Sequence, residues 1–188
     1  MLIHNQFYIL YMFWVFLIIK VCTVEIKIKN DSNNDNNNNI ENIADTVNQL
    51  MQKSVDEIKL ILNDKYYYVS NASNNKFNIY KTLIFYSEKG TTFDFQHHYS
   101  TGFIFNLQLL KNNIKIVFQN ITFYDYYDIN LNNSLMFFEI PFENNHYEIE
   151  FYNCTFKNIY GIANIFYYIS PKSNQSSPHV QYINCKFM

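Results

Sequence analysis

Three segments of the sequence share one spacing of large apolar residues around an asparagine. These segments are 116–123 (IVFQNITF), 149–156 (IEFYNCTF) and 180–187 (VQYINCKF). Aligned on Asn120, Asn153 and Asn184, they recur after 33 and 31 residues. A fixed period of this length marks a repeat architecture, in which each unit buries its apolar face only against its neighbours. The repeat therefore restricts the fold more than any other feature of the chain.

The apolar positions change parity at the asparagine of each segment. Before it, large side chains occupy every second position and so share one face of a strand. After it they have the opposite parity, which a straight strand could not bury. A bend at the asparagine resolves this, because asparagine tolerates the left-handed conformation better than other non-glycine residues. We expect asparagine to stack on asparagine with amide hydrogen bonds between them, and aromatic rings to stack inside. The predicted rung residues are Phe118, Asn120, Phe123, Phe151, Asn153, Cys154, Phe156, Tyr182, Asn184, Cys185 and Phe187.

Further runs rich in β-branched and aromatic residues separate the repeated segments, including 134–140 (SLMFFEI) and 163–169 (ANIFYYI). One turn of the chain then holds about three short strands joined by variable loops. The prediction is an all-β fold, a right-handed parallel β-helix of about four coils over residues 57–188. Upstream, Ser87 lies 33 residues before Asn120, but Glu88 and Gly90 replace the following apolar positions, which predicts a degenerate first full coil.

The region before residue 57 divides into three parts. Residues 1–23 resemble a signal peptide, because the 13 apolar residues 7–19 suit a signal core of about 7–15 residues better than a spanning helix of about 20. An uncleaved membrane anchor and a buried segment stay open as alternatives. Residues 24–39 contain an Asn-rich stretch and predict a disordered linker. Residues 40–56 place apolar side chains at helical spacing and predict an amphipathic cap helix over the open end of the sheets.

Six acceptor triplets for N-glycosylation fit a secretory route. They begin at Asn30, Asn71, Asn120, Asn132, Asn153 and Asn174. Because asparagine is abundant in this chain, several such triplets would arise by chance. The triplets therefore permit secretion without establishing it.

The Phe-x-Asn-Cys-x-Phe units resemble the repeats of pectin-lyase-like right-handed β-helix proteins. They look closest to repeats of the polymorphic outer membrane protein type and to the large secreted or membrane-anchored β-helix proteins of Asn-rich protists. Residues 47–88 are similar to the amino-terminal cap and first coil of such proteins. The resemblance implies the fold and leaves the activity open, because this fold serves enzymes, adhesins and structural proteins alike.

The enzymes of this family are a poor match. The resembling lyases generally use an arginine base beside carboxylate-bound calcium, whereas all 14 basic residues here are lysines. The resembling hydrolases use clustered aspartates on an outward face. The outward columns predicted here are Lys115, Glu148 and His179, and next to them Val117, Glu150 and Gln181. Neither column supplies paired carboxylates at general acid/base spacing.

Other reactive groups have structural explanations at least as good as functional ones. Cys154 and Cys185 occupy one rung position in neighbouring coils, so they form either two buried thiols, a disulfide or, least favoured, part of a metal site. Asp125 and Asp128 form the one close acidic pair after a rung and suit an exposed loop. His97 and His98 are adjacent on a strand and would face opposite ways. We predict no catalytic residue, cofactor or metal.

The sequence thus predicts a non-enzymatic secreted or cell-surface module, an adhesion or recognition fragment. Its partner would be an extracellular protein or a glycan, with the tyrosines of 123–127 (FYDYY) as candidate glycan contacts. A net charge of −2 argues against nucleic acid. The uncapped last unit predicts self-association, and a membrane contact would use only residues 7–19. The alternatives are a pectin-lyase-like enzyme and a truncated, non-functional copy.

Overall fold

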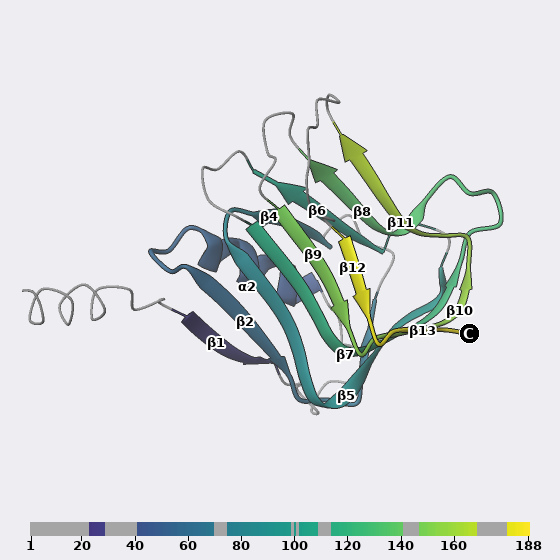
Figure 1. Cartoon of the computed structure of the whole chain (residues 1–188), viewed down its shortest axis with the longest axis horizontal. Helices are drawn as coiled ribbons and strands as arrows, with labels where there is room; N and C mark the ends of the chain where they lie inside the picture. The colour runs from purple at the N-terminus through teal and green to yellow at the C-terminus, as the bar shows by residue number, and fades with distance from the viewer. Residues whose placement is uncertain are drawn as a thin grey trace, which may run out of the picture.

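A computed structural model describes residues 23–28, 41–69, 75–98, 100, 102–108, 114–140, 147–168 and 180–188. The chain winds into an all-β parallel solenoid of about 4 turns. One sheet has nine strands and the other has four, and their apolar faces enclose a shared core (Figure 1). Residues 7–19 and most of the predicted linker lie outside the described residues.

The elements follow the predicted β-type runs closely. The nine-stranded sheet contains β1 (Thr23–Ile28), β2 (Glu57–Leu62), β3 (Tyr66–Tyr68), β5 (Thr82–His98), β7 (Ile114–Tyr127), β9 (Tyr147–Tyr152), β10 (Thr155–Tyr160), β12 (Val180–Ile183) and β13 (Lys186–Phe187). The four-stranded sheet contains β4 (Lys76–Ile79), β6 (Phe103–Leu107), β8 (Ser134–Ile140) and β11 (Ile162–Tyr168). The single described helix is α2 (Glu41–Met51).

Strand pairing places equivalent residues of successive turns side by side. All the printed pairings are parallel, and Phe118 of β7 pairs with Phe85 of β5 on one side and Phe151 of β9 on the other. Two inward columns cross six strands of the larger sheet. They are Val24, Ile58, Leu83, Ile116, Ile149 and Val180, and Ile26, Leu60, Phe85, Phe118, Phe151 and Tyr182. The aligned apolar residues of the repeat therefore are spatial neighbours.

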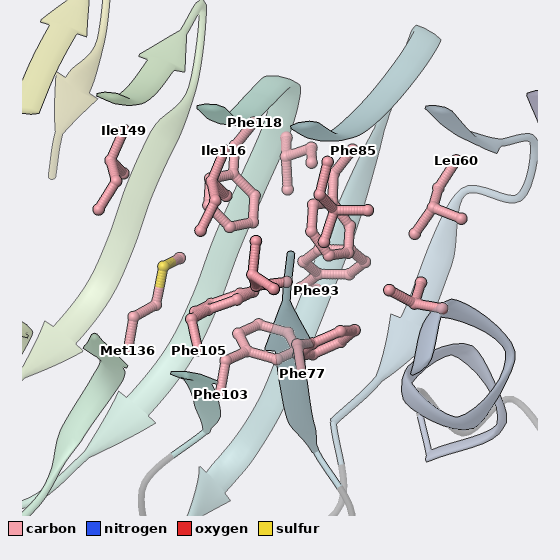
Figure 2. Close-up of a cluster of buried hydrophobic side chains, with 14 of the residues drawn as sticks. Leu60, Phe77, Phe85, Phe93, Phe103, Phe105, Ile116, Phe118, Met136 and Ile149 are labelled. Carbon is pink, nitrogen blue, oxygen red and sulfur yellow. The ribbon is translucent and has the colours of Figure 1, made fainter. Parts of the chain in front are cut away.

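Aromatic rings fill the interior between the sheets (Figure 2). Phe118 stacks on Phe85 with ring centroids 4.9 Å apart, and on Phe151 at 5.1 Å. Phe105 of the opposite sheet stacks on Phe77 at 5.0 Å and meets Phe118 edge-on at 5.8 Å. The stacked distances match the spacing of about 4.8 Å between paired strands, so backbone pairing sets the separation of the rings.

The asparagines of the repeat adopt the predicted corner conformation. Asn120, Asn153 and Asn184 have φ angles of 59°, 52° and 53°. The expected amide-to-amide ladder takes a different form, because the side-chain nitrogen of Asn120 donates to the carbonyl oxygen of Ser87 at 2.8 Å. Ser87 in turn donates through Oγ to the carbonyl oxygen of Leu62 at 3.0 Å. At these two corners, the side chains of Asn120 and Ser87 thus bond to the backbone of the preceding turn.

Substitution of a corner residue separates backbone conformation from side-chain chemistry. Asn153 is exposed, so Asn153→Ala should lower the free energy of unfolding by about 1 kcal/mol, because alanine disfavours positive φ. Asn153→Gly should change it little, since glycine adopts this conformation freely. Urea unfolding of the two variants measures the difference, and equal losses in both would show that the amide side chain matters instead.

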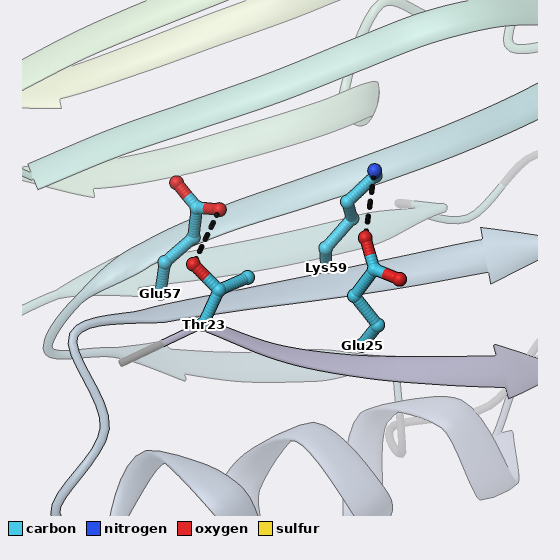
Figure 3. Close-up of polar contacts among 4 residues, drawn as sticks. All are labelled: Thr23, Glu25, Glu57 and Lys59. Carbon is cyan, nitrogen blue, oxygen red and sulfur yellow. Dashed lines mark hydrogen bonds and ion pairs between the residues drawn. The ribbon is translucent and has the colours of Figure 1, made fainter. Parts of the chain in front are cut away.

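Residues 23–28 correct the predicted boundaries at the N-terminus. They form β1, which pairs in parallel with β2, whereas the sequence places them at the end of the signal and in the linker. Alternation of Val24, Ile26 and Ile28 toward the core explains the strand. On the outer side, Lys59 Nζ lies 2.9 Å from Glu25 Oε1, and Thr23 Oγ1 donates to Glu57 Oε1 at 3.3 Å (Figure 3).

Helix α2 lies within the predicted range 40–56 and ends five residues earlier, at Met51. A turn follows, in which the Lys53 N–H donates to the carbonyl oxygen of Leu50. The apolar face of α2 packs into the core through Ile43, Ala44, Val47, Leu50 and Met51. The amide of Asn48 donates to the carbonyl oxygen of Lys76 and accepts from the N–H of Asn78, so the helix bonds to the backbone of β4.

Candidate functional site

The predicted outward columns meet in an ion-pair cluster. Lys115 Nζ lies 2.7 Å from Glu150 Oε1 and 3.5 Å from Glu148 Oε2. Burial lowers the pKa of Lys115, but the hydrogen bond and charge of Glu150, followed by those of Glu148, outweigh it and raise the pKa. One ammonium group thus bridges two strands and holds both carboxylates. The cluster ties neighbouring turns together, and His179 lies outside the described residues.

Asp125 and Asp128, the acidic residues that follow the corner at Asn120, have separate partners and do not act as a pair. Asp125 Oδ1 lies 3.2 Å from His97 Nδ1, and the His97 ring stacks on Tyr127 at 4.3 Å. Asp128 is 2% exposed and accepts hydrogen bonds from the N–H groups of Asn130 and Asn133. The prediction of an exposed loop is therefore wrong for Asp128, whose carboxylate is buried and closes the turn after β7. The side chain of His98 lies outside the described part.

Cys154 and Cys185 are free thiols in neighbouring turns, so they form no disulfide. Cys154 is buried, as the alternative of two buried thiols predicts, whereas Cys185 is only half-buried. Cys154 Sγ donates to the carbonyl oxygen of Phe118 at 3.3 Å, and Cys185 Sγ to that of Phe151 at 3.2 Å. Each thiol thus bonds to the backbone of the turn before it, as the side chain of Asn120 does. Within the described residues, no cluster of three or more His, Cys, Asp or Glu side chains could hold a metal.

Stability should fall in alkaline solution. Burial raises the pKa of Cys154 from 9.0 to about 12, and that of Tyr67 from 10.0 to about 12. Above about pH 9 the unfolded chain releases protons that the folded chain retains, so stability that is complete below this pH is lost toward pH 12. The urea midpoint should fall between about pH 8 and about pH 10, and should fall less in Cys154→Ala. Equal falls in both proteins would contradict the assignment to Cys154.

The acceptor asparagines for glycosylation have different environments. Asn132 and Asn153 are exposed, whereas Asn120 is half-buried and bonded to Ser87. Asn30, Asn71 and Asn174 lie outside the described residues. Glycosylation stays a prediction, and the described acceptors best placed for it are Asn132 and Asn153.

The repeat is interrupted once among its described corners, in β5. Tyr86 pairs with Gln119 and Thr91 with Ile121, so residues 87–90 stand opposite the single residue Asn120. This insertion restores the pattern in space, because Phe93 pairs with Phe123. The coil that looks degenerate in sequence therefore has a complete aromatic rung. Gly90 closes the inserted corner with a φ of 84°, a conformation that favours glycine.

The insertion forms the wall of a surface groove, which we call the corner groove. Its volume is about 480 Å³ and its lining residues are Asn63, Lys65, Lys89, Gly90, Thr91, Thr92 and Thr122. Lys65 and Lys89 are exposed, and Lys65 Nζ lies 5.8 Å from the centre of the Tyr66 ring. Thr91 Oγ1 donates to the carbonyl oxygen of Asp64 at 2.7 Å. The ammonium group of Lys89 and the side-chain hydroxyls of Thr92 and Thr122 have no hydrogen-bond partner among the described residues.

The groove opens onto an outward surface of β3, β5, β7 and β10, which we call the tyrosine–threonine face. Strand pairing aligns its residues in two outward columns. They are Tyr66, Thr92, Thr122 and Thr155, and Tyr68, Asp94, Tyr124 and Lys157. Tyr66 is 40% exposed and Tyr68 39% exposed, so both rings are accessible from the outside of the sheet. The face offers aromatic rings beside regularly spaced hydroxyls.

Of the tyrosines of 123–127 predicted to contact a glycan, Tyr126 is buried and Tyr124 lies on this face, where glycan contact stays a prediction. Sequence reasoning missed the corner groove. The imperfect repeat upstream of Asn120 contained a signal for the groove. It keeps the apolar residues of the pattern but has three extra residues at the corner, which indicates an insertion. The segment SEKG could therefore have been assigned to a bulge. Sequence alone could not show that Lys65, from the preceding turn, lies beside it.

Comparison with protein-family models, curated proteins and solved structures finds no significant match to this chain. Across the described residues, no helix combines the length and apolar character needed to cross a membrane.

Proposed function

We propose that this chain is a non-enzymatic recognition module of the cell exterior that binds glycans on its tyrosine–threonine face. The observation that carries the proposal is the alignment of exposed Tyr66 and Tyr68 with the hydroxyls of Thr92 and Thr122. Aromatic rings suit the apolar faces of sugars, and hydroxyls suit their polar edges. Parallel strands hold these groups in fixed positions, so binding orders few side chains.

Binding of the secreted full chain to immobilised neutral and acidic oligosaccharides tests this proposal. Tyr66→Ala with Tyr68→Ala should weaken binding about tenfold, which corresponds to the loss of two ring contacts. Tyr152→Ala is the matched control, because Tyr152 is 37% exposed on β9, away from this face. Equal losses in the two variants would refute the assigned face, and binding to none of the oligosaccharides would refute glycan recognition.

The non-enzymatic part of the proposal rests on the state of the acidic groups. Glu148 and Glu150 share Lys115, Asp125 pairs with His97, and Asp128 is buried in a turn. The pectin-lyase-like enzyme therefore remains the less favoured proposal. Incubation with acidic polysaccharides should release no oligosaccharides, and their release would overturn the non-enzymatic assignment.

We also propose that the chain is secreted, that it winds right-handed, and that it is related to pectin-lyase-like or polymorphic outer membrane proteins. The apolar run 7–19 and the exposed acceptors Asn132 and Asn153 support the secretory route. Right-handed winding follows the general preference of parallel crossover connections. We also propose that α2 caps the first turn, supported by the bonds of Asn48 to the backbone of β4.

A second proposed property is head-to-tail self-association. At one edge of the larger sheet, β12 exposes Tyr182 (42%) and Ile183 (37%), and Val180 and Tyr182 share inward columns with Val24 and Ile26 of β1 at the other edge. A second copy could therefore continue both columns. Sedimentation should show oligomers that Tyr182→Lys disrupts and Tyr160→Lys preserves. A monomer at all concentrations would refute this property.

A further inference from the structure

The corner groove is the place where the repeat departs from its own rule. The insertion 87–90 replaces a one-residue corner that the turns at Asn120, Asn153 and Asn184 use, and it brings Lys89 toward Lys65 of the previous turn. A segment that breaks a local rule without contributing to the core invites a functional explanation. Ser87 and Thr91 stay buried and bonded, so the insertion has a defined shape.

The groups around the groove have a definite chemical preference. Two lysines line it, and the hydroxyls of Thr92 and Thr122 remain available as donors. Among the described residues, none of the nearby acids lines the groove. The Asp64 carboxylate accepts from the Tyr67 hydroxyl, Asp94 Oδ1 accepts from the N–H of Gln96, and Glu88 is exposed. The local arrangement therefore favours an anion, although the whole chain has a net charge of −2 and no general attraction for polyanions.

We propose that the corner groove binds a sulfate ester on the glycan held by the tyrosine–threonine face, an inference that rests on the proposed function. Thr92 and Thr122 belong both to the groove and to that face, so one sugar residue can reach both. The volume of about 480 Å³ suits a sugar-sized group. Lysine ammonium groups act as point charges that bind a tetrahedral oxyanion such as sulfate without needing a bidentate fork, and the polyuronate probe below tests sulfate against carboxylate.

Titration calorimetry of the full chain with four probes tests the proposal. The probes are a sulfated oligosaccharide, the same oligosaccharide after desulfation, an unsulfated polyuronate oligosaccharide of equal length, and inorganic sulfate. The sulfated oligosaccharide should bind at least tenfold more tightly than the desulfated and polyuronate forms, with an affinity that falls as salt increases. Inorganic sulfate should compete with it weakly.

Two groove variants and one control locate the site. Lys65→Gln with Lys89→Gln should abolish the preference for the sulfated probe. Lys27→Gln with Lys53→Gln changes the net charge equally at two exposed lysines outside the groove and should leave binding unchanged. Thr122→Tyr fills the groove without altering charge and should also remove the preference. Urea unfolding of each variant confirms that it is folded.

The outcomes separate the two levels of the argument. Equal binding of the sulfated and desulfated probes would overturn the groove assignment and leave glycan recognition standing. Equal binding of the polyuronate would overturn the choice of sulfate. An equal loss in the Lys27 and Lys53 control would show a general charge effect and refute the site. Binding of no oligosaccharide would overturn the proposed function together with this inference.

Discussion

Phe118→Ala should lower the free energy of unfolding by about 3–5 kcal/mol. Phe118 is fully buried, stacks on Phe85 and Phe151, and meets Phe105 and Phe123 edge-on, so alanine leaves a cavity lined by four rings. These rings are fixed by strand pairing and cannot collapse into the space. Because small domains are stable by only about 5–15 kcal/mol, the variant should be largely unfolded in moderate urea.

Phe187→Ala is the matched control for this substitution. Phe187 occupies an aromatic column too, but it is 64% exposed and stacks on Phe156 from one side only. Its loss should cost less than about 1 kcal/mol, since little apolar area becomes newly exposed. Urea unfolding followed by near-ultraviolet circular dichroism measures both variants. Similar losses would contradict the claim that stability resides in the central rings.

Gly102→Ala should destabilise the chain by about 3 kcal/mol through overpacking. A Cβ atom at this position would lie 2.7 Å from the carbonyl oxygen of Leu135 and would also collide with the Phe95 ring. Phe95 is itself buried between Phe103 and Tyr126, so it has nowhere to move. The backbone of β8 must therefore shift, which disturbs its pairing with β6.

Gly90→Ala distinguishes overpacking from backbone strain. The nearest atom to a Cβ at Gly90 is the carbonyl oxygen of Asn120 at 3.9 Å, so the only cost is the positive φ of 84°. The expected loss is about 1 kcal/mol. Thermal unfolding measures the loss of stability in both variants. A smaller loss for Gly102→Ala than for Gly90→Ala would show that the backbone of β8 shifts at little energetic cost.

The fold was largely predictable because the sequence pattern within each repeat specifies its strands and its corner. Alternation around Asn153 defines the strands, the change of parity defines the corner, and the period of about 30 residues defines the stacking. The conformations of Asn120, Asn153 and Asn184 confirm this reasoning. Two predictions failed where the relevant partner lies outside the local pattern. The strand at 23–28 depends on pairing with β2, and amide-to-amide bonds lose to the backbone carbonyl of Ser87.

The candidate site was less predictable for the same reason. Core positions can be recognised from the periodicity of apolar residues. Lys65 and Lys89 belong to no such pattern in the sequence. They become neighbours because β3 and β5 belong to successive turns and the insertion pushes one corner outward. The exposure of Tyr66 and Tyr68 could not be predicted either, because three consecutive tyrosines do not show which of them faces inward.

The parallel order of the larger sheet gives the chain a mechanical character. Strands β1 and β12 lie at opposite edges of this sheet, so tension between them pulls across the rows of interstrand hydrogen bonds and loads them in succession. Such a stack opens by peeling, one turn after another, because each turn is held only by its neighbours. Each released repeat of 31 or 33 residues adds roughly 100 Å of extended chain. A stack of this kind lengthens under load in steps and keeps the remaining turns folded.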